Sequence, residues 1–126
     1  MSAIKPEPFL YHAEVCSVYD GDTCRLDIDL GLGVWVHNES VRLFGINAPE
    51  VRGAEKVAGK VSRDKLRQWV LNQSVIIKTV STRKGKSKKG KYGRYLAIIW
   101  AQNDSDEWYN VNERLVSEGL AVFKDY

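Results

Sequence analysis

The sequence predicts one mainly β domain: a five-stranded barrel with a helix after the third strand and a short helix near the C-terminal end. Three observations predict this fold. The 126 residues are 44% hydrophobic and 28% charged, a composition typical of a globular chain with one core. Short segments rich in β-forming residues alternate with turns that contain Gly or Asp, and one longer stretch has helical periodicity. No apolar run approaches the roughly 18 residues that a membrane-spanning helix requires.

The domain is expected to span residues 13–126, after an N-terminal extension at 1–12. The first two strands, at 13–19 and 23–30, form a hairpin around the Asp-Gly-Asp turn, because Gly and Asp favour tight turns. The second strand is the clearer one, since four apolar residues alternate with polar ones: Cys24, Leu26, Ile28 and Leu30.

The third strand is expected in two parts, at 34–36 and 41–46, interrupted by a polar loop at 37–40. Pro49 then ends this strand, because proline cannot donate a hydrogen bond to a neighbouring strand.

The stretch 54–73 is the predicted main helix. Four of its residues share one face at 100° per residue and are expected to point into the core: Ala58, Val61, Leu66 and Trp69.

Strands are expected at 74–80 and 95–100, with a short strand at 107–109. Asn110 and Glu113 resemble a capping pair that starts a short helix, and Gly119 is placed to end it. A helix between the third and fourth strands of a small barrel is the arrangement of the OB-fold.

Two cysteines, Cys16 and Cys24, exclude a disulfide-rich scaffold and a four-cysteine zinc site. Their number still allows one disulfide, but we expect both to be free, part-buried thiols on neighbouring strands. The two histidines, His12 and His37, lack the spacing of metal ligands and are expected at the surface.

Positive charge is concentrated in residues 83–94, which hold seven of the 19 Lys and Arg residues and no acidic residue. The rest of the chain has 12 basic against 16 acidic residues and is therefore mildly negative. A basic segment on an acidic body indicates a polyanionic partner such as nucleic acid. An ordinary solvated loop is the simpler alternative, since lysine-rich loops are common.

Three stretches are more polar than their surroundings: residues 20–23, Arg42 with residues 47–50, and residues 91–94. Their carboxylate and amide oxygens suit Ca²⁺ or another hard cation, and their guanidiniums can bind phosphate through two parallel hydrogen bonds. Each stretch alone could be a turn or a strand end. Only their joint occurrence indicates a site for phosphoryl transfer.

Four motifs make the sequence similar to one known family. They are D-G-D-T at 20–23, R-L-F-G-I-N-A-P-E at 42–50, K-Y-G-R-Y-L-A at 91–97 and V-N-E-R-L-V-S-E-G-L-A at 111–121. In this order they resemble the staphylococcal (thermonuclease) nucleases. The resemblance implies an OB barrel and calcium-dependent hydrolysis of DNA and RNA, in which water attacks phosphorus and the 5′ oxygen leaves.

The resemblance also implies a calcium site. Asp22 matches a calcium carboxylate, Ala48 a backbone carbonyl ligand, and Glu50 a ligand that acts through water. Asn47 stands where the family usually has Asp, so this site has one negative charge fewer. Because ligand charge tunes calcium affinity, one Ca²⁺ ion should bind more weakly than is usual for the family.

The implied catalytic residues are Arg42, Glu50 and Arg94. Arg42 matches the first phosphate-binding arginine, and Glu50 the carboxylate that orients or deprotonates the attacking water. Arg94 matches the arginine that stabilises the five-coordinate phosphorus. The expected nucleic-acid contacts come from the basic segment: Lys84, Lys86, Lys88, Lys89, Lys91 and Tyr92.

Two interpretations follow: a calcium-dependent nuclease acting on DNA, RNA or both, and a non-catalytic nucleic-acid-binding module of the same fold. The presence of Asp22, Arg42, Glu50 and Arg94 together favours the enzyme, and Asn47 favours the binding module. The family continues into a Tyr-rich stretch and a third helix where this chain stops at Tyr126, so both a homo-oligomer and a monomer stay open.

No membrane partner is expected. The first 13 residues lack the apolar core of a signal peptide. This predicts a cytoplasmic protein, or a secreted one if a leader has been removed.

Overall fold

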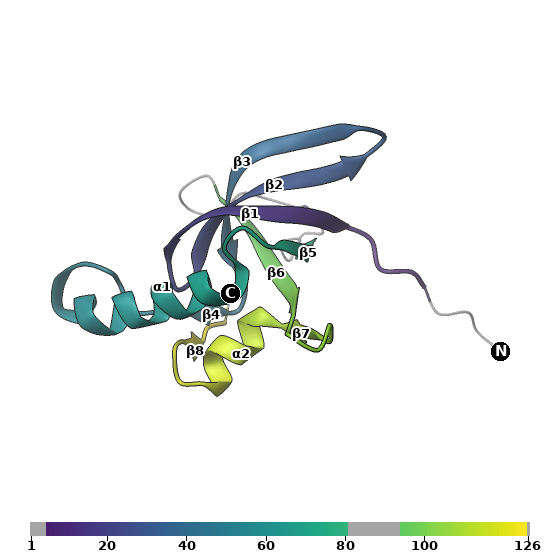
Figure 1. The fold of residues 1–126 in the computed structure, drawn as a ribbon. Helices are drawn as coiled ribbons and strands as arrows, with labels where there is room; N and C mark the ends of the chain where they lie inside the picture. Colours follow the sequence, from purple (N-terminus) through teal and green to yellow (C-terminus); the bar gives the residue numbers. More distant parts are fainter. Residues whose placement is uncertain (1–4, 81–93, 126) are drawn as a thin grey trace.

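Five strands close into a barrel through one parallel pairing (Figure 1). The computed structural model describes residues 5–80 and 94–125. Neighbouring strands pair antiparallel in the order β3-β2-β1-β5-β6. The first three residues of β6 pair in parallel with the last three residues of β3, and this pairing closes the barrel. The barrel strands are β1 Leu10–Asp20, β2 Thr23–Gly31, β3 Val34–Leu43, β5 Ser74–Thr79 and β6 Tyr95–Gln102. This closed mixed barrel confirms the predicted OB-fold class.

The remaining elements cover the barrel or extend it. Helix α1 packs against β1, and α2 packs against β6. Strand β7 pairs with β6, while the two short strands β4 and β8 pair with each other. Their bounds are β4 Ile46–Asn47, the 3₁₀ turn η1 Gly53–Glu55, α1 Lys56–Val70, β7 Trp108–Asn110, α2 Val111–Ser117 and β8 Val122–Phe123.

The predicted cap of the short C-terminal helix is confirmed. The Glu113 backbone N–H donates to Asn110 Oδ1 at 3.0 Å, which satisfies a donor that the first turn leaves unpaired. Gly119 has a φ of 74°, and the N–H of Leu120 donates to the Leu115 carbonyl at 2.8 Å. Glycine ends the helix because it adopts this left-handed conformation without strain.

Buried Asn112 fixes α2 to the barrel. Its side-chain Nδ2 donates to the carbonyls of Phe44 (2.9 Å) and Ala97 (3.1 Å), and its Oδ1 accepts from the Ile99 N–H (3.2 Å). These bonds satisfy a buried amide and hold the chain just before β4, which carries Asn47.

The alternation expected in the second strand is confirmed for three residues of the four. Cys24, Leu26 and Ile28 are buried, but Leu30 is 46% exposed. The reason is that the β2–β3 hairpin extends past the barrel (Figure 1), so its far end has no core to face.

The expected interruption at 37–40 is wrong, because β3 runs unbroken from Val34 to Leu43. His37 and Asn38 lie opposite the single residue Asp27, in a bulge where Asn38 has a φ of 56°. The Asn38 N–H donates to Asp27 Oδ1 at 2.8 Å. A bulge therefore holds the polar residues within the strand. The strand also ends before Ile46, which starts β4.

Helix α1 is shorter than the predicted 54–73, and its predicted buried face is partly wrong. Leu66 is buried and Trp69 is half-buried, but Ala58 and Val61 are exposed. The residues that face the barrel are Gly59, Ser62, Leu66 and Val70, so at three of the four positions the buried residue is the next one along the chain.

Close contacts explain this rotated face. A Cβ on Gly59 would lie only 2.0 Å from the Glu50 carbonyl oxygen, so only glycine fits there. The Ser62 hydroxyl donates to the Leu120 carbonyl at 2.6 Å, which satisfies a polar group in a core position. Periodicity of apolar residues does not report such contacts.

The two cysteines are free and lie on paired strands, as expected, although Cys16 is exposed and Cys24 is fully buried. Burial raises the pKa of Cys24 to about 12. His12 and His37 are exposed, which confirms the prediction. Among the described residues, no helix has the length and apolar character needed to cross a membrane.

Candidate active site

The Asp-Gly-Asp turn between β1 and β2 is buried. Asp20, Asp22 and Thr23 are each less than 10% exposed, and the Asp22 N–H donates to Asp20 Oδ1 at 3.0 Å. Gly21 has no positive φ. Instead, a Cβ at this position would lie 2.8 Å from the Cβ atoms of Ala48 and Ser62. Glycine is required here because α1 and the segment after β4 approach the turn closely.

Asp22 is the centre of the site. Its Oδ2 accepts a hydrogen bond from the Ala48 N–H at 2.8 Å and lies 3.4 Å from Arg42 Nη2. Its Oδ1 accepts from the Thr23 hydroxyl at 3.1 Å. This one carboxylate therefore joins the β1–β2 turn to β3 and to the segment after β4.

Arg42 is held in place by several acceptors. Its side chain is 12% exposed. Nη1 donates to the Ile46 carbonyl at 3.0 Å and to the Leu43 carbonyl at 3.3 Å, and Nη2 donates to Asn47 Oδ1 at 2.9 Å. Because its donors are fixed, the guanidinium keeps one orientation beside Asp22 and Asn47.

Arg94 reaches the same site from the position just before β6. Its Nη1 donates to Thr23 Oγ1 at 2.9 Å, and Thr23 in turn donates to Asp22. The parallel pairing of β3 with β6 places Val41 opposite Tyr95, which brings Arg94, the residue before β6, close to Arg42 on β3. Residues 52 positions apart thus enter one hydrogen-bonded network.

Glu50 is not part of that network. Its side chain is exposed and makes no hydrogen bond or ion pair with the residues that the structure describes. Its backbone is nonetheless fixed, because its carbonyl packs against Gly59 of α1. The carboxylate therefore lies on a fixed segment, three residues after Asn47, and faces solvent.

Sequence reasoning missed Asp20. It is 8% exposed, and burial, followed by the hydrogen bond and charge of Asp22, raises its pKa to about 7. A signal was available, since two acids flank one glycine at a strand end. Like-charged groups placed this closely are frequent at functional sites.

The donor set fits a hard cation. Asp20, Asp22 and Asn47 supply carboxylate and amide oxygens, and two buried carboxylates side by side are a charge that a cation would offset. Within residues 5–80 and 94–125, no cluster of three or more His, Cys, Asp or Glu side chains is close enough to bind a metal. Any cation here would therefore need the Asn47 oxygen, a backbone carbonyl such as that of Ala48, or water.

The structure brings together Asp22, Arg42, Asn47, Ala48 and Arg94 of the predicted site. It leaves the Glu50 carboxylate outside their hydrogen bonds. The predicted nucleic-acid contacts lie outside the described residues: Lys84, Lys86, Lys88, Lys89, Lys91 and Tyr92.

Comparison with known proteins supports the family resemblance that the sequence motifs indicate. The family described as "Staphylococcal nuclease homologue" matches residues 40–126. The chain is 36% identical to a thermonuclease of Staphylococcus intermedius over 112 residues, and 32% identical to one of Staphylococcus hyicus over 116 residues. An uncharacterized protein of Methanocaldococcus jannaschii is 31% identical over 130 aligned positions.

These matches cover 86%, 90% and 88% of this chain but only 57%, 59% and 58% of the three relatives. The chain thus spans a little over half the length of the proteins it matches. The fold, the network around Asp22 and the sequence similarity agree, and the chain belongs to the staphylococcal nuclease family.

Proposed function

We propose that this chain hydrolyses phosphodiester bonds of DNA or RNA and that the reaction requires calcium. The observation that carries the proposal is the single hydrogen-bonded network of Asp22, Arg42, Asn47, Thr23 and Arg94. Two guanidiniums beside a buried carboxylate at the edge of a barrel are suited to stabilising the charge of a phosphoryl group in transfer.

The two arginines bind the phosphate that is cleaved. Both guanidiniums are held by protein acceptors, so little reorganisation is needed when charge develops on the phosphoryl oxygens. Arg42 orients the phosphate beside Asp22. Arg94 stabilises the five-coordinate phosphorus and the leaving 5′ oxygen.

Glu50 acts on the water. Its exposed carboxylate orients the attacking water and accepts a proton from it. The water oxygen forms a bond to phosphorus as the bond from phosphorus to the 5′ oxygen breaks. The leaving oxygen then takes up a proton, so the products end in a 3′ phosphate and a 5′ hydroxyl.

Asp22, Asn47 and the Ala48 carbonyl would hold one calcium ion, with Glu50 acting through water. When bound, calcium supplies positive charge that offsets the charge of the phosphoryl oxygens. Asn47 leaves this set one charge short, so affinity should be lower than at a site with Asp in that position.

A non-catalytic nucleic-acid-binding module is the second candidate. The observation in its favour is that Arg42 already binds the oxygens of both Asp22 and Asn47. In this interpretation the guanidinium takes the place of the cation, and the site binds phosphate without hydrolysing it.

Incubation of the protein with plasmid DNA, single-stranded DNA and RNA tests the proposal, each with calcium and with chelator. Calcium-dependent cleavage that leaves 5′-hydroxyl ends is expected, and Glu50→Gln should lower its rate while substrate binding is retained. Cleavage at equal rate in chelator would exclude the metal role. Binding without cleavage in calcium, magnesium or manganese would favour the binding module.

A further inference from the structure

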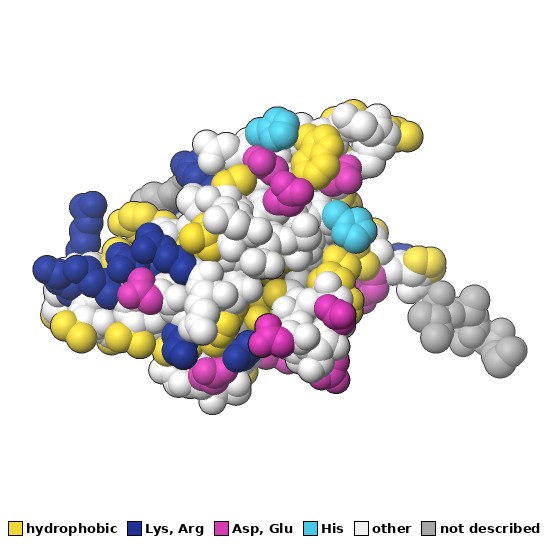
Figure 2. Space-filling model, in the orientation of Figure 1, with side chains coloured by type: hydrophobic (Ala, Val, Ile, Leu, Met, Phe, Trp, Pro, Cys, Tyr) yellow, Lys and Arg dark blue, Asp and Glu magenta, His cyan; other side chains and the backbone are white. Residues whose placement is uncertain are grey.

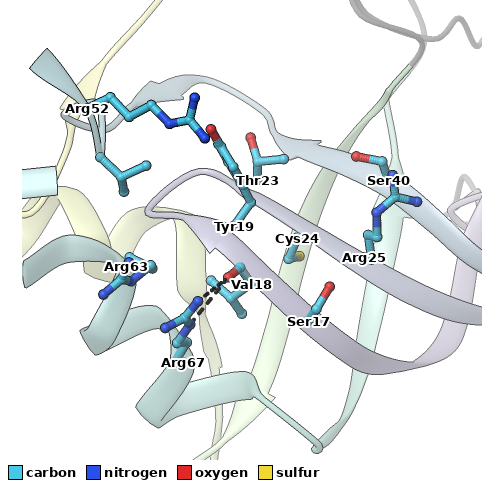
Figure 3. A pocket seen from close by; sticks show the side chains of 11 residues that line it. Ser17, Val18, Tyr19, Thr23, Cys24, Arg25, Ser40, Arg52, Arg63 and Arg67 are labelled. Carbon is cyan, nitrogen blue, oxygen red and sulfur yellow. Dashed lines mark hydrogen bonds between the residues drawn. The ribbon is translucent and has the colours of Figure 1, made fainter. Parts of the chain in front are cut away.

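A groove of about 600 Å³ lies beside the candidate active site, between the barrel and α1 (Figure 3). Four arginines line it: Arg25 from β2, Arg52 from the segment before α1, and Arg63 and Arg67 from α1. None of the described lining residues is acidic. Four guanidiniums around one groove are an unusual concentration of positive charge in a chain whose net charge is +3.

Three of these arginines are anchored by hydrogen bonds. Arg67 donates two, from Nε at 3.3 Å and Nη2 at 3.0 Å, to the Val18 carbonyl, which Figure 3 shows as dashed lines. Arg25 Nη1 donates to the Asn38 carbonyl at 2.8 Å, and Arg63 Nε donates to Asp64 Oδ1 at 3.0 Å. Anchored guanidiniums lose little side-chain entropy when they bind an anion.

Acidic side chains lie beside some of the lining residues that the structure describes. Asp64 pairs with Arg63 and lies 3.8 Å from Arg67, and its side chain is 62% exposed. Asp22 accepts a hydrogen bond from Thr23 on the side of the candidate active site. Arg52 is exposed and forms no hydrogen bond or ion pair with any residue that the structure describes. Figure 2 shows Lys and Arg side chains gathered over α1 on this side of the molecule.

The groove adjoins the candidate active site at Thr23. Thr23 lines the groove, accepts a hydrogen bond from Arg94 and donates one to Asp22. Tyr19 also lines it and is 54% exposed, so its ring is available to stack with a base. A polymer bound at Asp22 and Arg94 can therefore continue past Thr23 into the groove.

We propose that this groove binds backbone phosphates of the nucleic-acid strand on one side of the bond that is cleaved. The inference rests on the proposed function, because that function places the strand at the candidate active site. It adds a subsite that binds nucleotides beyond the one at the cleaved bond. Guanidiniums match phosphate through paired hydrogen bonds, and an aromatic ring beside them suits a polynucleotide better than an acidic peptide.

The test compares two double variants of the full chain with equal loss of charge. Arg52→Ala/Arg63→Ala removes two groove arginines, and Lys60→Ala/Lys65→Ala removes two exposed lysines of α1 that do not line the groove. Arg67 is kept, because its two bonds to Val18 join α1 to β1. Thermal melting confirms that both variants are folded.

Binding of a labelled 12-nucleotide single strand is measured in chelator at several salt concentrations. The arginine pair should raise Kd about tenfold and reduce the slope of log Kd against log salt by about 1.4, since each single-strand phosphate contributes about 0.7. The lysine pair should change Kd less than twofold. An equal rise in Kd in both double variants would overturn the proposal, because it would mean that the strand is attracted by the overall charge of this face and not bound in the groove.

Two further arms separate this inference from the proposed function. In calcium, the arginine pair should raise KM for the 12-nucleotide strand about tenfold but change KM for a dinucleoside monophosphate less than twofold, because that substrate carries only the phosphate that is cleaved. If the wild type cleaves nothing but the arginine pair still selectively weakens 12-mer binding, the groove stands and the nuclease proposal fails. If polyglutamate of equal charge competes as well as the oligonucleotide, the groove serves an acidic protein and the assignment is overturned.

Discussion

At the scale of single residues, Arg42 is the most constrained side chain of the candidate site. Its guanidinium contacts two backbone carbonyls, the Asn47 amide oxygen and the Asp22 carboxylate. A phosphate that enters must compete with these acceptors for the guanidinium, and a cation must compete with the guanidinium for the Asp22 and Asn47 oxygens. Changes at positions 42 and 47 are therefore coupled, and they test the site most directly.

Restoring an acid at position 47 should tighten calcium binding. Asn47→Asp keeps the acceptor for Arg42 and adds a full negative charge, with an expected gain on the order of 1–3 kcal/mol. Calorimetric titration with calcium measures the affinity. Asn47→Ala, which removes the side-chain oxygen, is the matched control. Identical calcium affinity in the wild type and both variants would show that residue 47 is not a ligand.

Removing either arginine should affect the rate more than substrate binding. Arg94→Ala and Arg42→Ala should lower kcat more than they raise KM, because both guanidiniums act where charge builds in the transition state. Lysine should rescue each only in part, since it keeps the charge without the paired hydrogen bonds. Steady-state kinetics on one short oligonucleotide measures this. A pure increase in KM would instead assign Arg94 to binding.

Asp20 should make the metal-free protein less stable as pH rises. Its pKa rises from 3.8 to about 7 on folding, so between these values the native state binds more protons than the unfolded state. Stability should therefore fall as pH increases from about 4 to 7. Asp20→Asn should remove this slope and stabilise the protein at pH 8 by up to about 4 kcal/mol, given a shift of about 3 pK units and about 1.4 kcal/mol per unit.

Urea unfolding in chelator at pH 5 and pH 8 measures the effect. Asn at this position keeps an oxygen that can accept from the Asp22 N–H, so the turn is preserved. A slope that persists unchanged in Asp20→Asn would assign the pH dependence to another group.

At the scale of elements, the position of α1 is set by contacts of its small residues. Gly59 lies against the Glu50 carbonyl, and Ser62 binds the Leu120 carbonyl and faces Gly21. The helix thereby fixes the backbone of the segment that carries Asn47, Ala48 and Glu50. Its docking and the geometry of the candidate site are consequences of the same contacts.

Gly59→Ala should destabilise the protein, although alanine favours helices by about 1 kcal/mol over glycine. The added Cβ would lie 2.0 Å from the Glu50 oxygen, so the helix must shift, at a cost of about 1–3 kcal/mol or more. Denaturant unfolding measures the loss, with Lys60→Ala on the exposed face as control. Increased stability in Gly59→Ala would show that the helix does not pack this closely on residues 50–51.

Over the whole molecule, 12 of the 19 Lys and Arg residues lie in α1 and in the segment 83–94, five and seven respectively. The segment lysines should act by charge alone: replacing Lys84, Lys86, Lys88 and Lys89 with Gln should weaken substrate binding and flatten its salt dependence. The rate at saturation should change little. Kinetics at two salt concentrations measures both quantities. A loss of kcat in these variants would place the segment in the catalytic step.

The fold class, the order of the main elements and the cap at Asn110 could be predicted from the sequence. These follow from local rules: alternation along β2, turn residues between strands, and a side chain that caps its own helix. The four motifs were also sufficient to indicate the family. Local signals of this kind depend only on residues close in the chain.

Which residues meet depends on tertiary packing. The parallel pairing of β3 with β6 brings Arg94 to Thr23, and burial of the turn raises the pKa of Asp20. The same packing buries Gly59 and Ser62 of α1 instead of Ala58 and Val61, and it leaves the Glu50 side chain exposed. Close approach and desolvation depend on residues distant in the chain, so periodicity and composition could not report them.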